Sequence, residues 1–312
     1  MTGGLAGWER LDPALRAVAT TRTNFSRRAV KLMREPFDDR RREAAALLDV
    51  SGLQIADHTA QADAARVPVR VYRGGQSEPA PVVVFCHAGG FALGNLDTDH
   101  RQCVELARRG SCTVVSVDYR LSPEHRYPAA LDDAITALRW VAADATELGV
   151  DAARIAVAGS SAGACLAACL AQGSADGALP AVAFQLLHQP VLDDRETPSK
   201  AEFGTSPAFD GEAAELMWGH YLSPNGSAAA VPARRDRLAG LPTALITCAE
   251  IDPFRDEAVE YAQRLLRAGV STELNVFART CHGFDSLLPD WSVSQRLFEL
   301  QGEALRRVWD DA

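Results

Sequence analysis

The chain alternates short apolar runs rich in β-branched residues with longer segments whose apolar residues recur at helical spacing. Runs of the first kind predict buried strands, and segments of the second kind predict helices. Repeated strand–helix alternation predicts a mostly parallel sheet with helices on both faces. The predicted strands cover residues 81–87, 113–117, 154–158, 182–187, 243–249 and 272–277, and the predicted helices cover 101–109, 129–143, 162–172, 256–268 and 292–308.

Two segments interrupt this alternation. Residues 8–49 have amphipathic helical spacing, and we expect Pro36 to separate two helices there because proline breaks the helical hydrogen-bond ladder. Residues 193–238 are rich in Pro, Gly, Ser and Ala around one helical stretch at 212–222. Long excursions of this kind often form lids over a ligand site. Between residues 53 and 71, alternating apolar positions predict a pair of antiparallel strands.

Composition narrows the functional classes. The 312 residues are 47% hydrophobic and 23% charged, which is ordinary for a globular protein of one large or two smaller domains. The formal net charge of −9 argues against nucleic acid or an anionic membrane as the main partner. No basic stretch followed by an apolar run opens the sequence, and no apolar run reaches membrane-spanning length.

The cysteine content points to a reducing compartment. The chain has seven cysteines, an odd number, and none of them forms a Cys-x-x-Cys pair. This pattern predicts neither a metal site nor a redox-active pair, and it favours a cytoplasmic protein.

Candidate chemistry begins at residues 154–163, where an apolar strand-like run ends in Gly-Ser-Ser-Ala-Gly and a helical pattern follows at once. Gly-x-Ser-x-Gly between a strand and a helix is typical of a nucleophile elbow, which predicts Ser161 as the nucleophile. Gly159 and Gly163 leave room for the tight turn and for the close approach of strand and helix. A serine hydroxyl is a weak nucleophile until a base and an electropositive pocket surround it, so the motif predicts partners elsewhere.

The general base is expected to be a histidine after the nucleophile, because this class of elbow is followed by an acid and then by a histidine. Only His188, His220 and His282 follow Ser161. His188 lies inside a predicted strand and His220 lies in the 193–238 excursion. His282 follows the end of the last predicted strand, where open-sheet enzymes place their functional residues, and is the predicted base.

The acid should lie just past the preceding strand, in a stretch that offers Glu250, Asp252, Asp256 and Glu257. Asp252 is the preferred candidate, since Pro253 then opens the loop. Its carboxylate would fix the tautomer and orientation of His282. Asp256 is the alternative, although a carboxylate in the first turn of a helix is also favoured for structural reasons alone.

Backbone donors for an oxyanion are expected in the loop after the strand at 81–87. Adjacent glycines, Gly89 and Gly90, let N–H groups crowd around a developing alkoxide without side-chain clashes. The N–H of Ala162, next to the nucleophile, is the third predicted donor. His87 is expected to brace this loop, because it precedes Ser161 and so falls outside the order expected of a base.

Six motifs spread over most of residues 50–310 read His-Ala-Gly-Gly-Phe (87–91), Asp-Tyr-Arg-Leu-Ser-Pro-Glu-His (118–125), Tyr-Pro-Ala-Ala-Leu-Asp-Asp (127–133), Gly-Ser-Ser-Ala-Gly (159–163), Asp-Pro-Phe-Arg-Asp-Glu (252–257) and His-Gly-Phe (282–284). Together they resemble the hormone-sensitive-lipase-like, bacterial family IV carboxylesterases of the α/β-hydrolase superfamily. The resemblance implies an α/β-hydrolase fold, with an eight-stranded, mostly parallel sheet flanked by helices and a helical cap. It also implies hydrolysis of small, short-acyl carboxylic esters through an acyl-enzyme, with no cofactor and no metal.

The resemblance also implies a division of the chain. Residues 1–50 form an N-terminal cap segment, 51–192 the first part of the hydrolase core, 193–238 a cap insertion and 239–312 the second part of the core. Relatives often pair through an edge strand, which implies a homodimer.

Two positions depart from the family pattern. Ala88 replaces the first of three consecutive glycines in the oxyanion loop, while the two glycines to which the family assigns donors are present. Ser160 stands where relatives often carry an acidic residue, directly before the nucleophile. The triad is therefore expected to be complete, with altered polar surroundings.

The same sequence is also compatible with other functions. One is a specialised reaction on the same triad, such as amide hydrolysis, acyl transfer or lyase-type elimination, because fold and triad do not fix the substrate. Another is a non-catalytic small-molecule receptor, against which the retention of a complete triad argues. A further set of large side chains could line the substrate pocket or form the core of the cap: Phe91, Phe209, Met217 and Trp218.

Overall fold

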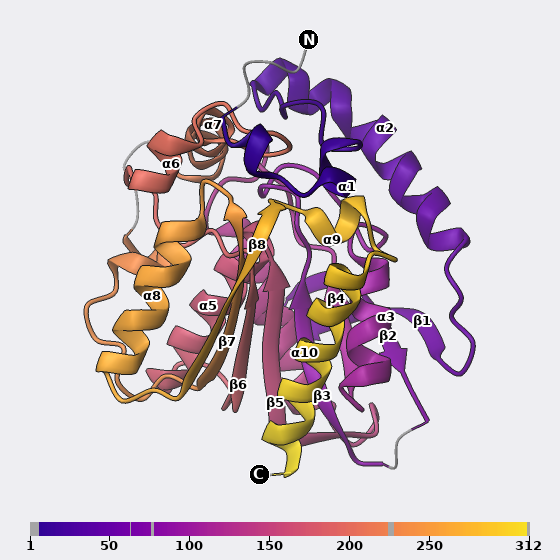
Figure 1. The fold of residues 1–312 in the computed structure, drawn as a ribbon. Helices are drawn as coiled ribbons and strands as arrows, with labels where there is room; N and C mark the ends of the chain where they lie inside the picture. The colour runs from indigo at the N-terminus through magenta and orange to yellow at the C-terminus, as the bar shows by residue number, and fades with distance from the viewer. Residues whose placement is uncertain (1–5, 63, 76–77, 224–227, 311–312) are drawn as a thin grey trace.

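The computed structural model describes the whole chain except residues 1–5, 63, 76–77, 224–227 and 311–312. One eight-stranded sheet has the order β1-β2-β4-β3-β5-β6-β7-β8 (Figure 1). β2 pairs antiparallel with β1 and with β4, and every other neighbouring pair is parallel. The strands are β1 (Gln54–Ala62), β2 (Ala65–Arg73), β3 (Ala80–Cys86), β4 (Thr113–Val117), β5 (Val150–Ser160), β6 (Phe184–His188), β7 (Thr243–Ile251) and β8 (Thr272–Cys281).

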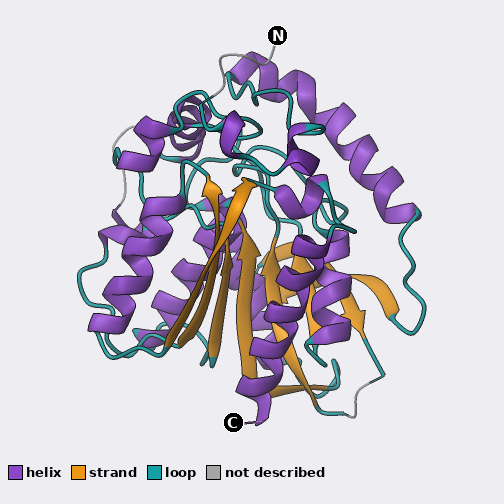
Figure 2. Cartoon of the chain, viewed as in Figure 1, coloured by secondary structure: helices purple, strands orange, loops and turns teal. Residues whose placement is uncertain are grey.

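Helices cover both faces of the sheet, because residues along the central strands alternate between two apolar layers (Figure 2). Val82 and Val84 of β3 pack in the layer that contains α4, α5 and α8. Val83 and Phe85 pack in the layer that contains α3 and α10. These helices are α3 (His100–Arg109), α4 (Ala129–Ala143), α5 (Ala162–Ala175), α8 (Arg255–Arg267) and α10 (Ser292–Asp310).

The N-terminal helix differs from expectation. α2 runs without a break through Arg27–Ala46 and contains Pro36, so the prediction of two helices separated at this proline is wrong. Proline in a helix leaves the carbonyl four residues earlier without its usual donor. That carbonyl belongs to Leu32, a residue that is 66% exposed, so water can satisfy it there. A surface position thus lowers the cost that normally breaks a helix at proline.

Two segments lie beyond the carboxyl ends of the strands, and we call them the cap: residues 6–50 and the described residues of 193–238, which are 193–223 and 228–238 (Figure 1). The two segments are joined directly to each other. The backbone N–H of Thr23 donates to the carbonyl of Ala208 at 2.8 Å, and His220 Nε2 donates to the carbonyl of Phe25 at 2.8 Å. The cap contains the short helices η1 (Trp8–Arg10), η2 (Ala228–Ala230) and η3 (Pro232–Arg234) as well as α1 (Pro13–Arg16), α2, α6 (Pro198–Glu202) and α7 (Gly211–Tyr221).

A buried ion pair fastens the cap to the core. Lys200 Nζ of α6 lies 2.6 Å from Glu257 Oε2 of α8, and both side chains are almost completely buried. Lys200 also donates to the carbonyls of Asp193 and Arg195, and Glu257 accepts the backbone N–H of Leu192. Burial raises the pKa of Glu257 to about 7, although the neighbouring ammonium opposes this shift.

We expect Lys200→Met to lower the free energy of unfolding by about 3–5 kcal/mol near neutral pH, because it leaves a buried carboxylate without its cation. The pKa of Glu257 is raised in the folded state, so stability is greatest with the group protonated and falls as pH rises through that pKa. The loss should therefore be larger at about pH 8 than at about pH 6 in denaturant melts. Lys31→Met, at the other lysine of the chain and on the exposed side of α2, is the matched control. Equal losses in the two variants would contradict this account.

Candidate active site

Ser161 occupies the sharp turn between β5 and α5, with φ 55° and ψ −117°. A positive φ in a residue other than glycine is strained and persists only where surrounding contacts hold it. The backbone N–H of Ser161 donates to the carbonyl of His188 at 2.8 Å. Its carbonyl in turn accepts the N–H groups of Ala164 and Cys165 in the first turn of α5. The strand end and the helix start thus fix the hydroxyl at the carboxyl edge of the sheet.

The two glycines of the elbow are required by close approach. A Cβ atom on Gly163 would lie 2.0 Å from the carbonyl oxygen of Cys86, and one on Gly159 would lie 2.3 Å from the carbonyl carbon of Gly163. No real Cβ makes such contacts with backbone atoms, so α5 could not approach β3 and β5 with side chains at these positions.

Ser161, His282 and Asp252 form one hydrogen-bonded chain. His282 Nε2 lies 2.9 Å from Ser161 Oγ, and His282 Nδ1 lies 2.8 Å from Asp252 Oδ2. A carboxylate can only accept, so Nδ1 carries the proton in the neutral ring and Nε2 is free to accept from the Ser161 hydroxyl. Asp252 is fully buried, and its Oδ1 accepts the backbone N–H of Phe254 at 2.9 Å. The fold therefore brings together three side chains that follow β5, β7 and β8.

The other candidate histidines have different partners. His188 lies between Thr247 Oγ1, at 2.8 Å, and Asp285 Oδ1, at 3.1 Å. His220 is occupied by the carbonyl of Phe25 in the cap. Neither ring forms a hydrogen bond with Ser161 among the described residues.

The alternative acids also face away from the histidine. Asp256 pairs with Arg255 at 2.8 Å, and its backbone N–H donates to Ser199. Glu250 pairs with Arg10 at 2.7 Å. Of the four acidic residues in this stretch, Asp252 is the one placed against His282.

The loop after β3 presents free backbone donors. Gly89 and Gly90 have φ values of 125° and 61°, and a Cβ on Gly89 would lie 2.0 Å from the carbonyl oxygen of Leu93. Within the described residues, no hydrogen bond uses the N–H of Gly89, of Gly90 or of Ala162. All three residues belong to the elbow or its facing loop, and both glycines line the same cavity as Ser161.

Side chains around this loop hold it in place. The ring of His87 stacks on Tyr119 at 4.1 Å between centroids, and the Tyr119 hydroxyl donates to the His87 carbonyl at 2.7 Å. Burial lowers the pKa of His87 to about 4, which keeps the ring neutral at neutral pH. The N–H of Ala88 donates to Asp99 Oδ2 at 2.6 Å.

The supporting contacts of two further residues could not be predicted from the sequence. Asp99 precedes α3 and has the sequence position of a helix cap, yet its side chain makes no cap hydrogen bond and holds Ala88 instead. Gln189 has a positive φ of 46°, and its Oε1 accepts the N–H of Gly283, next to His282, at 2.6 Å. Both contacts join residues far apart in the sequence, and no local pattern signals them.

A cavity of about 210 Å³ lies above Ser161 and His282. Its walls are mainly apolar and come from both the core and the cap. Phe209 is among its lining residues, whereas Phe91, in the loop after β3, stacks on Tyr221 of the cap helix α7 at 3.8 Å. Met217 and Trp218 belong to the same buried cluster. The lining includes Thr23, Phe25, Phe37, Leu93, Ala208, Phe209 and Leu287.

In the part of the chain that the structure describes, no three or more His, Cys, Asp or Glu side chains are grouped as a metal ion would require. None of the described helices combines the length and the apolar character needed to cross a membrane.

Comparison with known proteins places the chain in a family. The family model described as "alpha/beta hydrolase fold" matches residues 83–286. Esterase LipI of Mycobacterium tuberculosis is 42% identical over 210 residues, which are 66% of each chain, and carboxylesterase NlhH of the same species is 42% identical over 230 residues, 70% of this chain and 71% of that protein. The crystal structure of esterase LipW from Mycobacterium marinum is 64% identical, covers 98% of each chain and superposes with a TM-score of 0.95.

The elbow, the sheet order and these similarities define a serine hydrolase of the α/β-hydrolase fold. The chain belongs to the hormone-sensitive-lipase-like family of that superfamily, and its activity is carboxylic ester hydrolysis. The predicted fold class and the predicted enzyme class are both confirmed.

Proposed function

We propose that Ser161, His282 and Asp252 are the catalytic triad of this esterase, and that Gly89, Gly90 and Ala162 form its oxyanion hole. The observation that carries the proposal is the hydrogen-bonded chain from Ser161 Oγ through His282 to the buried Asp252, at the floor of an apolar cavity. We propose further that the substrates are small esters with short acyl chains.

In the first half-reaction, His282 Nε2 takes the proton from Ser161 Oγ as the oxygen attacks the ester carbonyl. The carbonyl oxygen becomes an anion that accepts the three backbone N–H groups, each typically worth about 3 kcal/mol of barrier. His282 then protonates the departing alcohol, and the acyl group stays on Ser161. The buried carboxylate of Asp252 stabilises the imidazolium throughout without taking its proton.

In the second half-reaction, water replaces the alcohol. His282 Nε2 removes a proton from the water as its oxygen attacks the acyl carbonyl, and the same three donors accept the second oxyanion. Collapse of this intermediate breaks the bond to Ser161 Oγ, which recovers its proton from His282. The products are a carboxylic acid and an alcohol, and no cofactor enters either step.

The size of the cavity limits the acyl chain. Its volume of about 210 Å³ suits a small ester better than one with a long acyl chain. We expect kcat/KM for p-nitrophenyl esters to be highest for acetate or butyrate and at least about tenfold lower for decanoate, because the longer chain does not fit within the cavity when its carbonyl is at Ser161. A fluorophosphonate should label Ser161 in the same preparation. A protein that is labelled but prefers decanoate would contradict the short-acyl proposal, and a protein that is not labelled would contradict the triad.

We propose a cytoplasmic setting and a homodimeric assembly for the enzyme. All seven cysteines are buried free thiols, which suits a reducing compartment. The edge strand β8 exposes 44% of Val276, and an open strand edge is a template for pairing with a second copy.

A further inference from the structure

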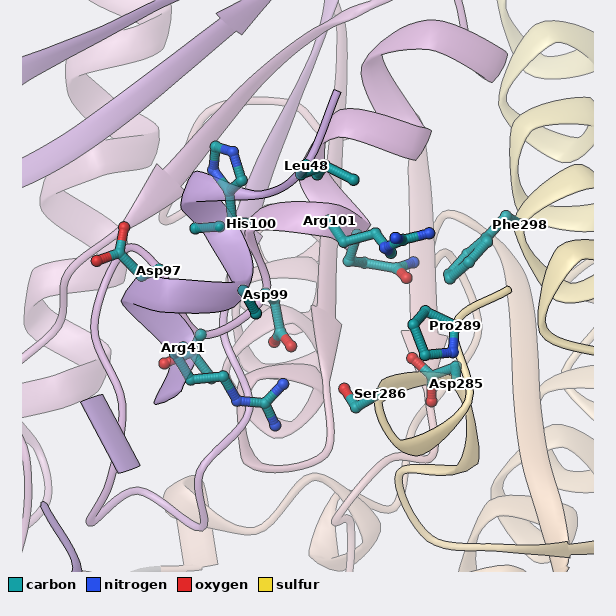
Figure 3. Close-up of a pocket in the computed structure, with 14 residues that line it drawn as sticks. Arg41, Leu48, Asp97, Asp99, His100, Arg101, Asp285, Ser286, Pro289 and Phe298 are labelled. Atoms are coloured by element: carbon teal, nitrogen blue, oxygen red, sulfur yellow. The ribbon is translucent and has the colours of Figure 1, made fainter. Parts of the chain in front are cut away.

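A second, smaller cavity of about 120 Å³ adjoins the substrate cavity, and we call it the polar chamber (Figure 3). It lies between α2, the start of α3 and α9 (Phe284–Leu287). Four of its lining residues, Arg41, Asp99, Asp285 and Ser286, also line the cavity above Ser161. These four side chains therefore stand at the boundary between the two cavities.

Most charged groups of the polar chamber are already paired. Asp97 is bound to Arg70 at 2.6 Å, and Arg101 is bound to Asp290 at 2.7 Å. Asp285 accepts a hydrogen bond from the buried His188 at 3.1 Å. The charges of Asp97 and Arg101 are thus neutralised by neighbouring side chains.

Arg41 and Asp99 are the exceptions. Among the described residues no ion pair and no hydrogen bond involves the Arg41 guanidinium, whose one specific contact is the face of the Phe37 ring at 5.0 Å. Asp99 is buried, and one of its oxygens, Oδ2, accepts the N–H of Ala88. Figure 3 shows the Arg41 guanidinium and the Asp99 carboxylate directed into the same space. Burial raises the pKa of Asp99, and the charge of Arg41 opposes that shift. The two groups therefore interact electrostatically, although no ion pair joins them among the described residues.

The space between Arg41 and Asp99 favours some chemical groups of a ligand over others. A ligand carboxylate would face the charges of Asp99 and Asp285, and an ammonium group would face Arg41. An apolar group would leave buried polar atoms without partners, which is costly. A hydroxyl group can accept from the guanidinium and donate to the carboxylate at the same time.

We propose that the polar chamber binds a hydroxyl-bearing part of the ester substrate, and that Arg41 is a specificity-determining residue for it. The inference rests on the proposed function, because it extends the same cavity. The polar chamber, at about 120 Å³, is smaller than the substrate cavity and suits a short hydroxyalkyl chain. The substrate class is thus esters of polyols or of short hydroxy acids.

Two matched pairs of esters test this. Glyceryl monoacetate is compared with n-propyl acetate for hydroxyls on the alcohol side, and ethyl 4-hydroxybutyrate with ethyl butyrate for a hydroxyl on the acyl side. In at least one pair we expect the wild-type kcat/KM to favour the hydroxylated ester by about tenfold, since a hydrogen bond to a charged group is lost in its partner. Arg41→Met should bring that ratio to within about twofold of unity. Arg42→Met, which removes an exposed surface pair with Asp39, should keep the wild-type ratio.

The outcomes separate the two proposals. Wild-type ratios near unity in both pairs would overturn the subsite proposal and indicate that the polar chamber holds only water. Activity on the plain esters would then still support the proposed triad. A ratio that survives Arg41→Met would overturn the role of Arg41. A preference for ethyl hemisuccinate over both ethyl butyrate and the hydroxylated esters, lost in Arg41→Met, would overturn the hydroxyl class in favour of an anion. Absence of activity on every ester would instead count against the proposed function.

Discussion

Replacing Ser161 by alanine is expected to lower kcat for p-nitrophenyl butyrate about a million-fold, leaving only the rate that binding and backbone donors can supply. The reason lies in the geometry. Ser161 Oγ is the atom that His282 Nε2 contacts, and an alanine leaves the ring with no proton to take. KM should change little, because the apolar walls and the backbone donors remain. Steady-state rates on purified protein, with circular dichroism to confirm folding, measure this.

Ser160→Ala is the matched control, one residue away at the end of β5. Its side chain forms no hydrogen bond with His282 or Asp252 among the described residues, so we expect kcat within about tenfold of wild type. If Ser160→Ala abolished turnover and Ser161→Ala kept it, the nucleophile would be assigned to the wrong serine.

The sequence predicts the sheet well because its central strands are buried on both faces. Every residue of β3 and β4 is buried, so neither strand shows the alternation of polar and apolar residues that is typical of a half-exposed strand. The observed ends of these two strands differ little from the predicted ones. The nucleophile is equally visible, since Gly159 and Gly163 are fixed by backbone contacts that no other residue allows.

Chain order also constrains the site. Few histidines follow Ser161, and parallel strands bring their carboxyl ends to one edge of the sheet, so a residue just past β8 lies at the same edge as one just past β5. His282 can be predicted for this reason. Its hydrogen bonds to Asp252 and to Ser161 then depend on loop conformations that the pattern alone does not determine.

What the sequence does not reveal are contacts that depend on tertiary surroundings. Helix α2 passes through Pro36 because the affected carbonyl lies at the surface, and surface position is set by packing. Lys200 lies in a polar segment, where a lysine is ordinarily exposed to solvent. Its burial against Glu257 depends on tertiary packing that the sequence does not show. The contact of Asp99 with Ala88 is of the same kind.

The missing acid before the nucleophile is also explained only by tertiary structure. Ser160 pairs along the sheet with His188, and the ring of His188 contacts Asp285, which lines the cavity. The neighbouring rings of His188 and His282 hold the pKa of Asp285 below its usual range despite burial. A carboxylate therefore stands near the elbow, contributed by α9 instead of β5.

Replacing Asp252 by asparagine is expected to lower kcat about ten-thousand-fold while the fold stays intact. An amide at this position can donate to His282 Nδ1, which moves the ring proton to Nε2 and removes the acceptor for the Ser161 hydroxyl. It also removes the negative charge that stabilises the imidazolium in the transition state. The measurement is kcat and KM for p-nitrophenyl butyrate, with KM expected to change little.

Asp256→Asn decides between the two acids that the sequence offers. Asp256 lies in the first turn of α8 and pairs with Arg255, so the loss of its charge should cost a surface ion pair of about 0.2–1 kcal/mol in stability and less than about tenfold in kcat. The reverse pattern, with Asp256→Asn inactive and Asp252→Asn active, would contradict the assignment. Because both aspartates precede or begin the same helix, a general disturbance of α8 would affect both variants alike. A loss confined to Asp252→Asn therefore reports the contact with His282.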